Sequence, residues 1–270
     1  IDLIGDLQCG RLTVVPPPEG RQPLAESELI ELLERVPRWD ANAWLQQRER
    51  YVALYGQTPF LPPDAHQAVL LQPMFSASGP GGASSVLGPG GQPIDVKTPD
   101  EFEQHARAVA MLLGRLIAQC RSVFLAGGDV LRLPIGEIVR DFETIAQIFP
   151  LATQPGPARR SELDIEAVQL RGIDVFLTDY QPPLPDRTGW ERLKGLRLSR
   201  ANLGVTSGDL QIRGLFGPAW SDPELRQTVT ALKGAGVPLS LIVLVGAGGA
   251  ARADAHLMAT ADLLRSLALD

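Results

Sequence analysis

A chain of 270 residues, 44% of them hydrophobic, can bury one large core, which predicts one main domain with an N-terminal extension. The 25 Lys and Arg residues are outnumbered by 31 acids, so the net charge of -6 argues against the clustered basic surface of a nucleic-acid-binding protein. No apolar run reaches the roughly 18 residues of a membrane-spanning helix. The first residues also lack the basic start of a signal peptide. We therefore expect a cytoplasmic protein that contacts neither nucleic acid nor membrane.

The two cysteines indicate no metal site. Cys9 and Cys120 lie far apart in the sequence and form no CxxC pair. Neither a disulfide framework nor a zinc site is signalled. Cys120 stands near the end of a helical pattern and just before a strand pattern, so we expect a buried structural thiol.

Residues 1–67 are predicted to be a helical extension. An amphipathic helix is expected over 26–36 and a second over 41–55, because apolar residues recur there at helical spacing. Gly56 follows the second helix, where a residue in the left-handed conformation would end it. The aromatic residues of this helix, such as Trp44 and Tyr51, are expected to make packing contacts.

The main domain, residues 68–270, is organised around the stretch from Ala68 to Gly91. The apolar run from Ala68 to Leu71 predicts a buried strand. A loop of Gly, Ser, Ala and Pro follows, with almost no side chains capable of chemistry. This loop is where we expect a function.

Strand and helix patterns alternate after this loop. Further strands are predicted over residues 122–126, 173–178, 201–206 and 239–245, each followed by a helical pattern. Five βα units in succession imply a parallel sheet in an α/β fold, either an open doubly wound sheet or a partial barrel. The last strand is an apolar run of the kind found when both faces are covered.

In either fold the ligand end is the carboxyl end of the strands. The best candidates there for acid–base catalysis are Asp129, Asp179 and Tyr180, which follow adjacent predicted strands. None of the three histidines is placed at this end by its pattern. His66, His105 and His256 are each expected to be surface or packing residues.

Two loops leave alternatives open. The polar segment over 150–162 is either a lid or a solvated connection. The segment from Leu210 to Trp220 carries large apolar side chains between glycines and a proline. It either covers a site at the mouth of the barrel or is a packed connection to the next helix.

From about Tyr55 to Leu269 the order of segments resembles the radical S-adenosylmethionine (SAM) superfamily, in particular its iron–sulfur oxidoreductases and coproporphyrinogen-oxidase-like proteins. The segments that carry the resemblance are TPFLPPDAHQAVLLQ, VFLAGGD, ANLGVTSGD and TALKGAGVPLSLIVLVGAGG. VFLAGGD stands in place of the family's Gly-Gly-Glu element, and ANLGVTSGD in place of its GLESGD segment. The resemblance implies a six-stranded partial α/β barrel, of which five strands are visible here.

The sequence departs from this family in the loop after the first strand. The family has CxxxCxxC there, because three thiolates hold a [4Fe-4S] cluster whose open iron binds SAM. The residues at these positions in the two nearest registers are Ala77, Gly81 and Ser84, or Ser78, Gly82 and Ser85. Ser and Gly cannot replace thiolates as iron ligands. We therefore expect no [4Fe-4S] cluster and no metal site.

Other positions of the family are partly kept. The resemblance implies that Gly127, Gly128 and Asp129 bind the amino group of a ligand, and the alternative is a strand-to-helix turn with Asp129 as a local cap. Ser207 could still donate or accept a hydrogen bond after the fourth strand. Gly246 and Gly248 would leave room for an adenine, although a plain tight turn explains them as well. Any residual binding of SAM or a related nucleoside is expected to be weak.

A Rossmann fingerprint is a competing interpretation of the same glycines. Gly246, Gly248 and Ala251 satisfy its spacing, but the motif expects a further strand with an acid about 20 residues on. The sequence to Asp270 contains no such strand.

Three hypotheses follow from the sequence. The first is a degenerate radical-SAM-like protein that binds a small molecule or a protein partner without a cluster. The second is an enzyme that has reused the mouth of the barrel for acid–base chemistry without iron. In the third, cluster chemistry is implied by homology and absent in fact.

Overall fold

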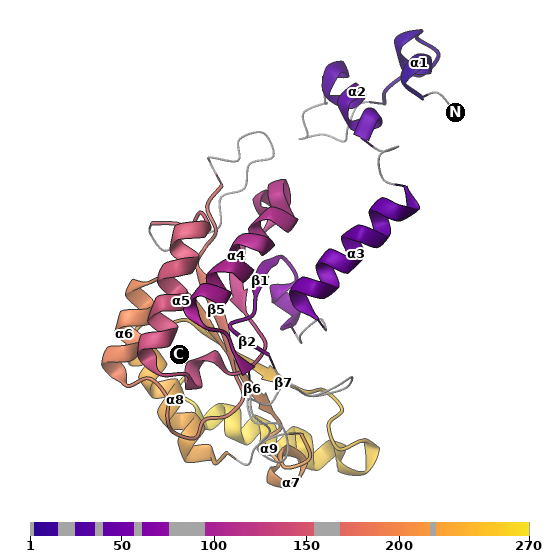
Figure 1. The fold of residues 1–270 in the computed structure, drawn as a ribbon. Helices are drawn as coiled ribbons and strands as arrows, with labels where there is room; N and C mark the ends of the chain where they lie inside the picture. The colour runs from indigo at the N-terminus through magenta and orange to yellow at the C-terminus, as the bar shows by residue number, and fades with distance from the viewer. Residues whose placement is uncertain are drawn as a thin grey trace. The chain divides into compact units, whose positions relative to one another are not determined.

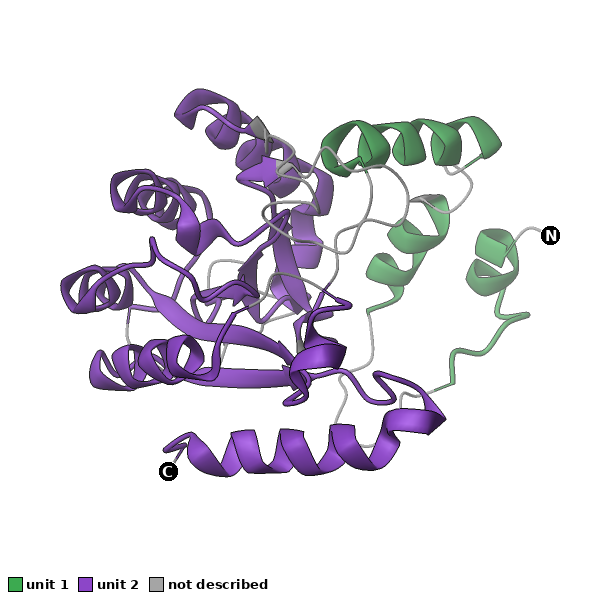
Figure 2. Ribbon diagram, turned by 90° about the horizontal axis from the view of Figure 1, so that it is seen from below, with its two compact units in different colours: residues 1–56 green, residues 57–270 purple. Residues whose placement is uncertain are grey.

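The structure is a computed structural model, and it describes residues 3–15, 25–35, 40–56, 61–75, 95–153, 168–216 and 220–269. The chain forms two compact units, Ile1–Gly56 and Gln57–Asp270 (Figure 2). Most of the glycine-rich loop and most of the 150–162 segment lie outside the described residues, so the predictions for them stay predictions.

The first unit contains three helices: α1 (Leu3–Gln8), α2 (Glu26–Arg35) and α3 (Ala41–Tyr55). Asp40 caps α3 by accepting a hydrogen bond from the Ala43 N–H at 2.8 Å. Gly56 ends the helix at a φ of 61°, as its position in the sequence predicted. Of the predicted packing residues Tyr55 is buried, whereas Trp44 and Tyr51 are exposed.

The second unit is built on a five-stranded parallel sheet. Its strands are β1 (Ala68–Leu71), β4 (Ser122–Leu125), β5 (Ile173–Leu177), β6 (Leu198–Thr206) and β7 (Leu239–Val243). They lie side by side in the order of the chain, β1-β4-β5-β6-β7. A doubly wound sheet requires the order to reverse. The steady order therefore decides for the partial α/β barrel.

Helices connect these strands and lie along one side of the sheet (Figure 1). They are α4 (Pro99–Leu113), α5 (Ile135–Ile148), α6 (Arg187–Gly195) and α8 (Asp222–Gly234), and α9 (Ala253–Ser266) follows β7. Thr98 opens α4 with the predicted capping box, in which its N–H and hydroxyl both donate to Glu101. None of the described helices is long and apolar enough to cross a membrane.

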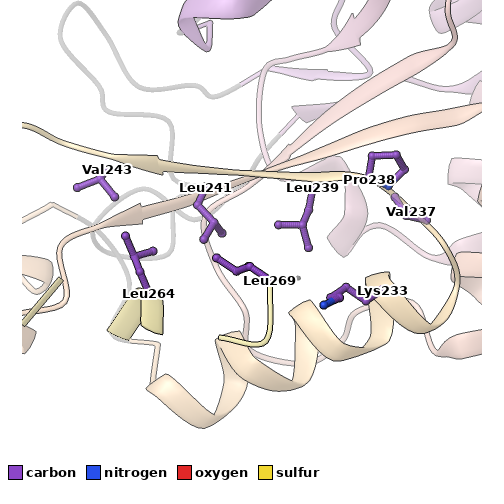
Figure 3. Close-up of a pocket in the computed structure, with 8 residues that line it drawn as sticks. All are labelled: Lys233, Val237, Pro238, Leu239, Leu241, Val243, Leu264 and Leu269. Carbon is purple, nitrogen blue, oxygen red and sulfur yellow. The ribbon is translucent and has the colours of Figure 1, made fainter. Parts of the chain in front are cut away.

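The side chains of the sheet alternate between two faces. One face, which we call the helix face, is apolar and fully buried at Val69, Leu71, Val123, Leu125, Ile173, Val175, Leu177, Ala201, Leu203 and Val205. The register places Leu239 and Leu241 on the same face, where they line a pocket with Lys233 of α8 and Leu264 of α9 (Figure 3). The opposite face, which we call the polar face, carries Leu70, Phe124, Asp174, Phe176, Asn202, Ser240 and Ile242.

The last strand differs from its prediction. β7 ends at Val243, all five of its residues are half-buried, and Leu244 and Val245 are exposed. The expectation that both faces of this run are covered was wrong. β7 is one of two edge strands, and its helix-facing side chains line a pocket, whereas β1, at the other edge, is buried with α4 packed on it.

Two further features were not predicted. A short antiparallel pair, β2 (Met74–Phe75) with β3 (Asp95–Val96), closes the base of the glycine-rich loop. Two-residue strands are too short to show alternation in the sequence. The helix α4 ends at Leu113, where Gly114 has a φ of 48°, and a 3-10 helix, η3 (Gly114–Gln119), continues toward Cys120.

Candidate functional site

Asp129 lies at the centre of the carboxyl end of the sheet. It follows β4, and its carboxylate accepts hydrogen bonds from the Thr178 N–H at 2.9 Å, the Thr178 hydroxyl at 3.0 Å and the Asp179 N–H at 2.9 Å. The side chain is fully buried, and this burial raises the pKa of Asp129 to about 7 despite the hydrogen bonds from Thr178 and the positive charge of Arg132. Asp129 therefore ties the end of β4 to the end of β5. It makes no side-chain hydrogen bond as a cap of the following 3-10 helix, η4 (Val130–Arg132).

Asp179 lies beside this tie and forms an ion pair with Arg132. It also accepts a hydrogen bond from the Gln181 N–H at 3.0 Å. Both side chains of the pair are largely buried, since 9% of the Asp179 side chain and 14% of the Arg132 side chain are exposed. Arg132 was not predicted, because its partner is 47 residues away in the sequence.

Tyr180 completes the predicted acid–base group and is wholly buried. Its hydroxyl donates to the Gly204 carbonyl at 3.2 Å, and its ring meets Trp220 edge to face at 4.8 Å between centroids. Burial, and then the neighbouring Asp129, raise its pKa well above the ordinary value. The structure thus brings Asp129, Asp179 and Tyr180 together.

Arg213 organises the neighbouring connection between β6 and α8. It belongs to a short helix, α7 (Leu210–Arg213), and its guanidinium lies 3.6 Å from the centroid of the Trp220 ring. It donates to the carbonyls of Ser207 and Trp220 at 3.1 Å and pairs with Asp222 at 2.9 Å. Of the apolar residues in the 210–220 segment, Trp220 is buried, which fits a packed connection.

Leu215 and Phe216 of that segment are exposed instead. The alternative in which the segment covers a site at the mouth of the barrel stays a prediction.

Ser207 lies one strand further along, after β6. Its hydroxyl is 2.8 Å from Nδ1 of His256 and accepts a hydrogen bond from the Asp209 N–H at 3.0 Å. Ser207 is fully buried, because the neighbouring Gly208 lies against the backbone of α9, with its missing Cβ only 2.1 Å from the Ala259 carbonyl oxygen. Ser207 is therefore part of a packed junction between β6 and α9.

Two histidines reach the carboxyl end after all. His256 does so through Ser207, and Nε2 of His105 accepts a hydrogen bond from the Gln72 N–H at 3.1 Å, just beyond β1. The prediction that both are surface or packing residues agrees with their burial, but the sequence pattern did not indicate their position near the ligand end. The spacing of residues in a helix predicts which side of the helix a side chain lies on, but not whether it lies near the amino or the carboxyl end of the sheet. Burial, and then Lys97, lower the pKa of His105 to about 4.

The glycines of the sequence motif have a steric role. Gly127 has a φ of 94°, and a Cβ there would lie 2.0 Å from the Met74 carbonyl oxygen. The chain after β4 therefore touches the base of the glycine-rich loop, which no other residue type would permit. Gly128 accepts a hydrogen bond from the Val130 N–H at 3.0 Å within the same turn.

Gly246 and Gly248 form a tight turn after β7. Their φ angles are 78° and 84°, and the Ala247 N–H donates to the Leu244 carbonyl at 3.2 Å. A Cβ on Gly248 would lie 2.7 Å from Cδ1 of Ile212, so this turn packs on α7. A 3-10 helix, η6 (Ala250–Arg252), stands between the turn and α9. A Rossmann phosphate site would have the long helix begin directly at the glycines.

The residues present do not fit an iron–sulfur cluster. Cys9 is exposed in the first unit, and Cys120 precedes β4 at the amino end of the sheet. Cys120 is half-buried and not fully buried as predicted, and burial raises the pKa of its thiol. Within the described ranges no three Cys, His, Asp or Glu residues form a metal-binding group. Residues 76–94 contain none of these four residue types.

Searches with the sequence returned no relative, since no protein-family model and no curated protein matches the chain. Solved structures do match, and the fold is similar to that of radical SAM enzymes. A cobalamin-dependent SAM radical enzyme, OxsB, matches at 11% identity and a TM-score of 0.46, over 72% of this chain and 26% of that one. Coproporphyrinogen III oxidase (HemN) from Escherichia coli, a radical SAM enzyme, matches at 14% identity and a TM-score of 0.46, over 84% of this chain and 46% of that one.

HydG, a maturase of the [FeFe]-hydrogenase, matches at 13% identity and a TM-score of 0.44, over 89% of this chain and 55% of that one. The chain thus spans between about a quarter and just over half of the length of these three proteins. At this level the likeness concerns the fold alone.

Proposed function

We propose that residues 57–270 form a cluster-free, radical-SAM-like module that binds a small molecule at the carboxyl end of its sheet and does not carry out radical chemistry. The observation that carries the proposal is the placement of the two cysteines. Neither cysteine lies in the loop after β1, and Cys120 precedes β4 at the amino end of the sheet, so this loop offers no thiolate where the family holds its cluster.

The carboxyl end keeps the features of a binding site in such folds. Parallel α/β sheets bind ligands at this end. Here it combines buried polar groups after β4, β5 and β6 with a glycine-rich loop after β1. Asp129 is already satisfied by Thr178 and Asp179, so an ammonium ligand would have to compete with these hydrogen bonds. Binding of SAM-like ligands is therefore expected to be weak.

Anaerobic reconstitution with iron and sulfide tests the first part of the proposal. We expect the wild-type protein to retain iron at background level and to lack the visible absorbance band of a cluster. A matched control restores the family spacing in the loop with Ala77→Cys, Gly81→Cys and Ser84→Cys. Stoichiometric iron on the wild-type protein would overturn the proposal, whatever the triple variant binds.

Titration calorimetry with S-adenosylhomocysteine tests the second part. We expect a Kd of about 1 mM, because the direct bond to an open iron is missing and each lost power of ten is about 1.4 kcal/mol. The Asp179→Asn variant should weaken this binding, and Asp141→Asn, a buried carboxylate within α5, should not. Micromolar binding would contradict the expectation of a weakened site, and the absence of binding would remove this ligand class from the proposal.

A second candidate is acid–base catalysis by Asp129, Asp179 and Tyr180. The observation in its favour is the pKa of about 7 that burial gives Asp129, since a catalytic acid or base works best near the ambient pH. The full burial of Asp129 and Tyr180 weighs against direct contact with a substrate.

A further inference from the structure

An apolar groove lies beside the edge strand β7, on the helix face of the sheet. Leu239, Leu241 and Val243 line it from β7, and Leu264 of α9 and Leu269 line it from the other side, around a cavity of about 560 Å³ (Figure 3). The β7 side chains are half-buried and Leu269 is 42% exposed, so solvent reaches the groove. A cavity of this volume is large enough for a small molecule, and its lining favours an apolar one.

The groove is elongated because it follows a strand. Val243 and Leu264 lie at one end of it, and Val237 and Pro238 lie at the other (Figure 3). Four residue steps separate Leu239 from Val243, which is about 13 Å at the strand rise of about 3.3 Å. An extended chain of single bonds advances about 1.2 Å per bond, so a linear chain of roughly eight to ten carbon atoms matches this length.

One end of the groove is basic. Among the described residues that line it, Lys233 of α8 is the only charged one, and no Asp or Glu is present. Its Nζ donates to the Ala268 carbonyl, which is a neutral acceptor, and an ammonium has three donors. At the same end Lys194 of α6 donates to the carbonyl of Gly236, the residue before Val237. This end therefore attracts an anion and offers no counter-charge to a cation.

We propose that the groove binds a linear aliphatic monoanion, of which a carboxylate with about eight carbon atoms is the simplest form. The chain lies along Leu239, Leu241 and Val243, and the carboxylate accepts a hydrogen bond from Lys233. The groove shares no residue with the group of Asp129, Asp179 and Tyr180. The proposal thus goes beyond the proposed function and does not rest on it.

Matched probes test the two parts of this chemistry. Octanoate and 1-octanol have the same chain length, but only octanoate is charged at neutral pH. In titrations followed by NMR of the Leu and Val methyl groups, we expect octanoate to bind at least threefold more tightly than octanol, since an exposed ion pair is worth up to about fivefold. Butyrate should bind at least tenfold more weakly than octanoate, because each half-buried methylene contributes about twofold. The shifted methyl groups should be those that line the groove.

Two variants that each remove one positive charge locate the head group. Lys233→Gln should abolish the preference for octanoate over octanol and leave the affinity for octanol within about twofold. Arg265→Gln is the matched control, because this arginine is on α9 with 76% of its side chain exposed and does not line the groove. It should leave the preference unchanged.

Two further variants locate the chain. Leu241→Thr keeps the β-propensity of the edge strand and should weaken the binding of both probes about threefold or more. Leu264→Gln keeps a good helix former in α9 and should have the same effect. Because these substitutions are on different elements, a folding defect in one variant leaves the other to decide.

Each other outcome overturns the inference. Examples are the absence of methyl shifts in the groove at 20 mM octanoate, equal binding of octanoate and octanol, and a preference that survives in Lys233→Gln or is lost in Arg265→Gln. Sedimentation of a dimer that excludes octanoate would show that a second copy of the chain covers the groove, and would also overturn the proposal. The iron and S-adenosylhomocysteine experiments concern other residues, so the proposed function can survive this failure.

Discussion

The two ends of the sheet each hold a buried aspartate, and the two are satisfied in different ways. At the amino end, Asp174 accepts hydrogen bonds from Ser122 at 2.7 Å and Ser199 at 2.5 Å and pairs with Arg171 at 2.5 Å. At the carboxyl end, Asp129 is held by two backbone N–H groups and one hydroxyl. One carboxylate has a cation in direct contact and the other does not.

This difference bears on the protonation of Asp129. A charged partner and hydrogen-bond donors both stabilise the ionised form of a carboxylate, whereas burial favours the protonated form, and for Asp129 burial outweighs the donors. The Asp174 cluster links β4, β5 and β6 with one charge balanced. Asp129 links β4 to β5 but has a pKa near 7, which makes the carboxyl end sensitive to pH in the neutral range.

The largest effect is expected for Asp174→Asn. The substitution leaves the partly buried Arg171 guanidinium without its counter-charge, so the free energy of unfolding should fall by about 3–5 kcal/mol. Urea unfolding at pH 7 measures it. The control is Ser122→Ala, which removes one hydrogen bond and should lose about 1 kcal/mol. Equal losses of unfolding free energy in the two variants would mean that the ion pair with Arg171 contributes no more than one hydrogen bond at this end.

A pH-dependent effect is expected for Asp129. Its folded pKa of about 7 lies above the unfolded value of 3.8, so the folded state binds more protons and stability falls as the pH rises from about 4 to 7. Over the whole range this change amounts to about 4 kcal/mol at about 1.36 kcal/mol per pKa unit, and about 3 kcal/mol of it falls between pH 5 and pH 8. Asp129→Asn should be less stable than the wild type at pH 5, because its amide nitrogen cannot accept a backbone N–H. The deficit should shrink by about 3 kcal/mol between pH 5 and pH 8.

Urea unfolding of both proteins across this range measures the change. Arg132, Asp179 and Tyr180 also face or adjoin Asp129 and are unchanged in the comparison. A deficit that stays constant from pH 5 to 8 would show that Asp129 remains ionised, and the contrast between the two ends would then disappear.

The smallest effect is expected for His105, and its sign is opposite. The folded pKa of about 4 lies below the ordinary 6.5, because burial and Lys97 disfavour the imidazolium. Stability is therefore lost as the pH falls from 6.5 toward 4, by about 3 kcal/mol over the whole range, of which about 2 kcal/mol falls between pH 7 and pH 5. His105→Gln keeps an acceptor for the Gln72 N–H and should remove this loss. The free energy of unfolding of the wild type and of His105→Gln, measured at pH 5 and pH 7, tests this. If both proteins lose the same stability between pH 7 and pH 5, His105 is not the source of the pH dependence.

The strands and most helices could be predicted from the sequence, because the core positions repeat with the period of each element. β1 was predicted at its observed bounds, and the capping box of α4 was found at Thr98. Missed features were short or depended on neighbours, such as the β2–β3 pair and the exposure of β7 at the edge. A local pattern contains no information about which strand is last in a sheet.

Sequence alone determined that the loop after β1 has no thiolates, and that Asp129, Asp179 and Tyr180 follow adjacent strands at one end of a parallel sheet. These are properties of residue identity and period. Only the tertiary structure decided that Asp129 is already satisfied by Thr178 and Asp179, that Arg132 pairs with Asp179, and that Asp174 joins Ser122, Ser199 and Arg171. These contacts join residues that are far apart in the chain, and which donors remain for each buried acceptor depends on packing.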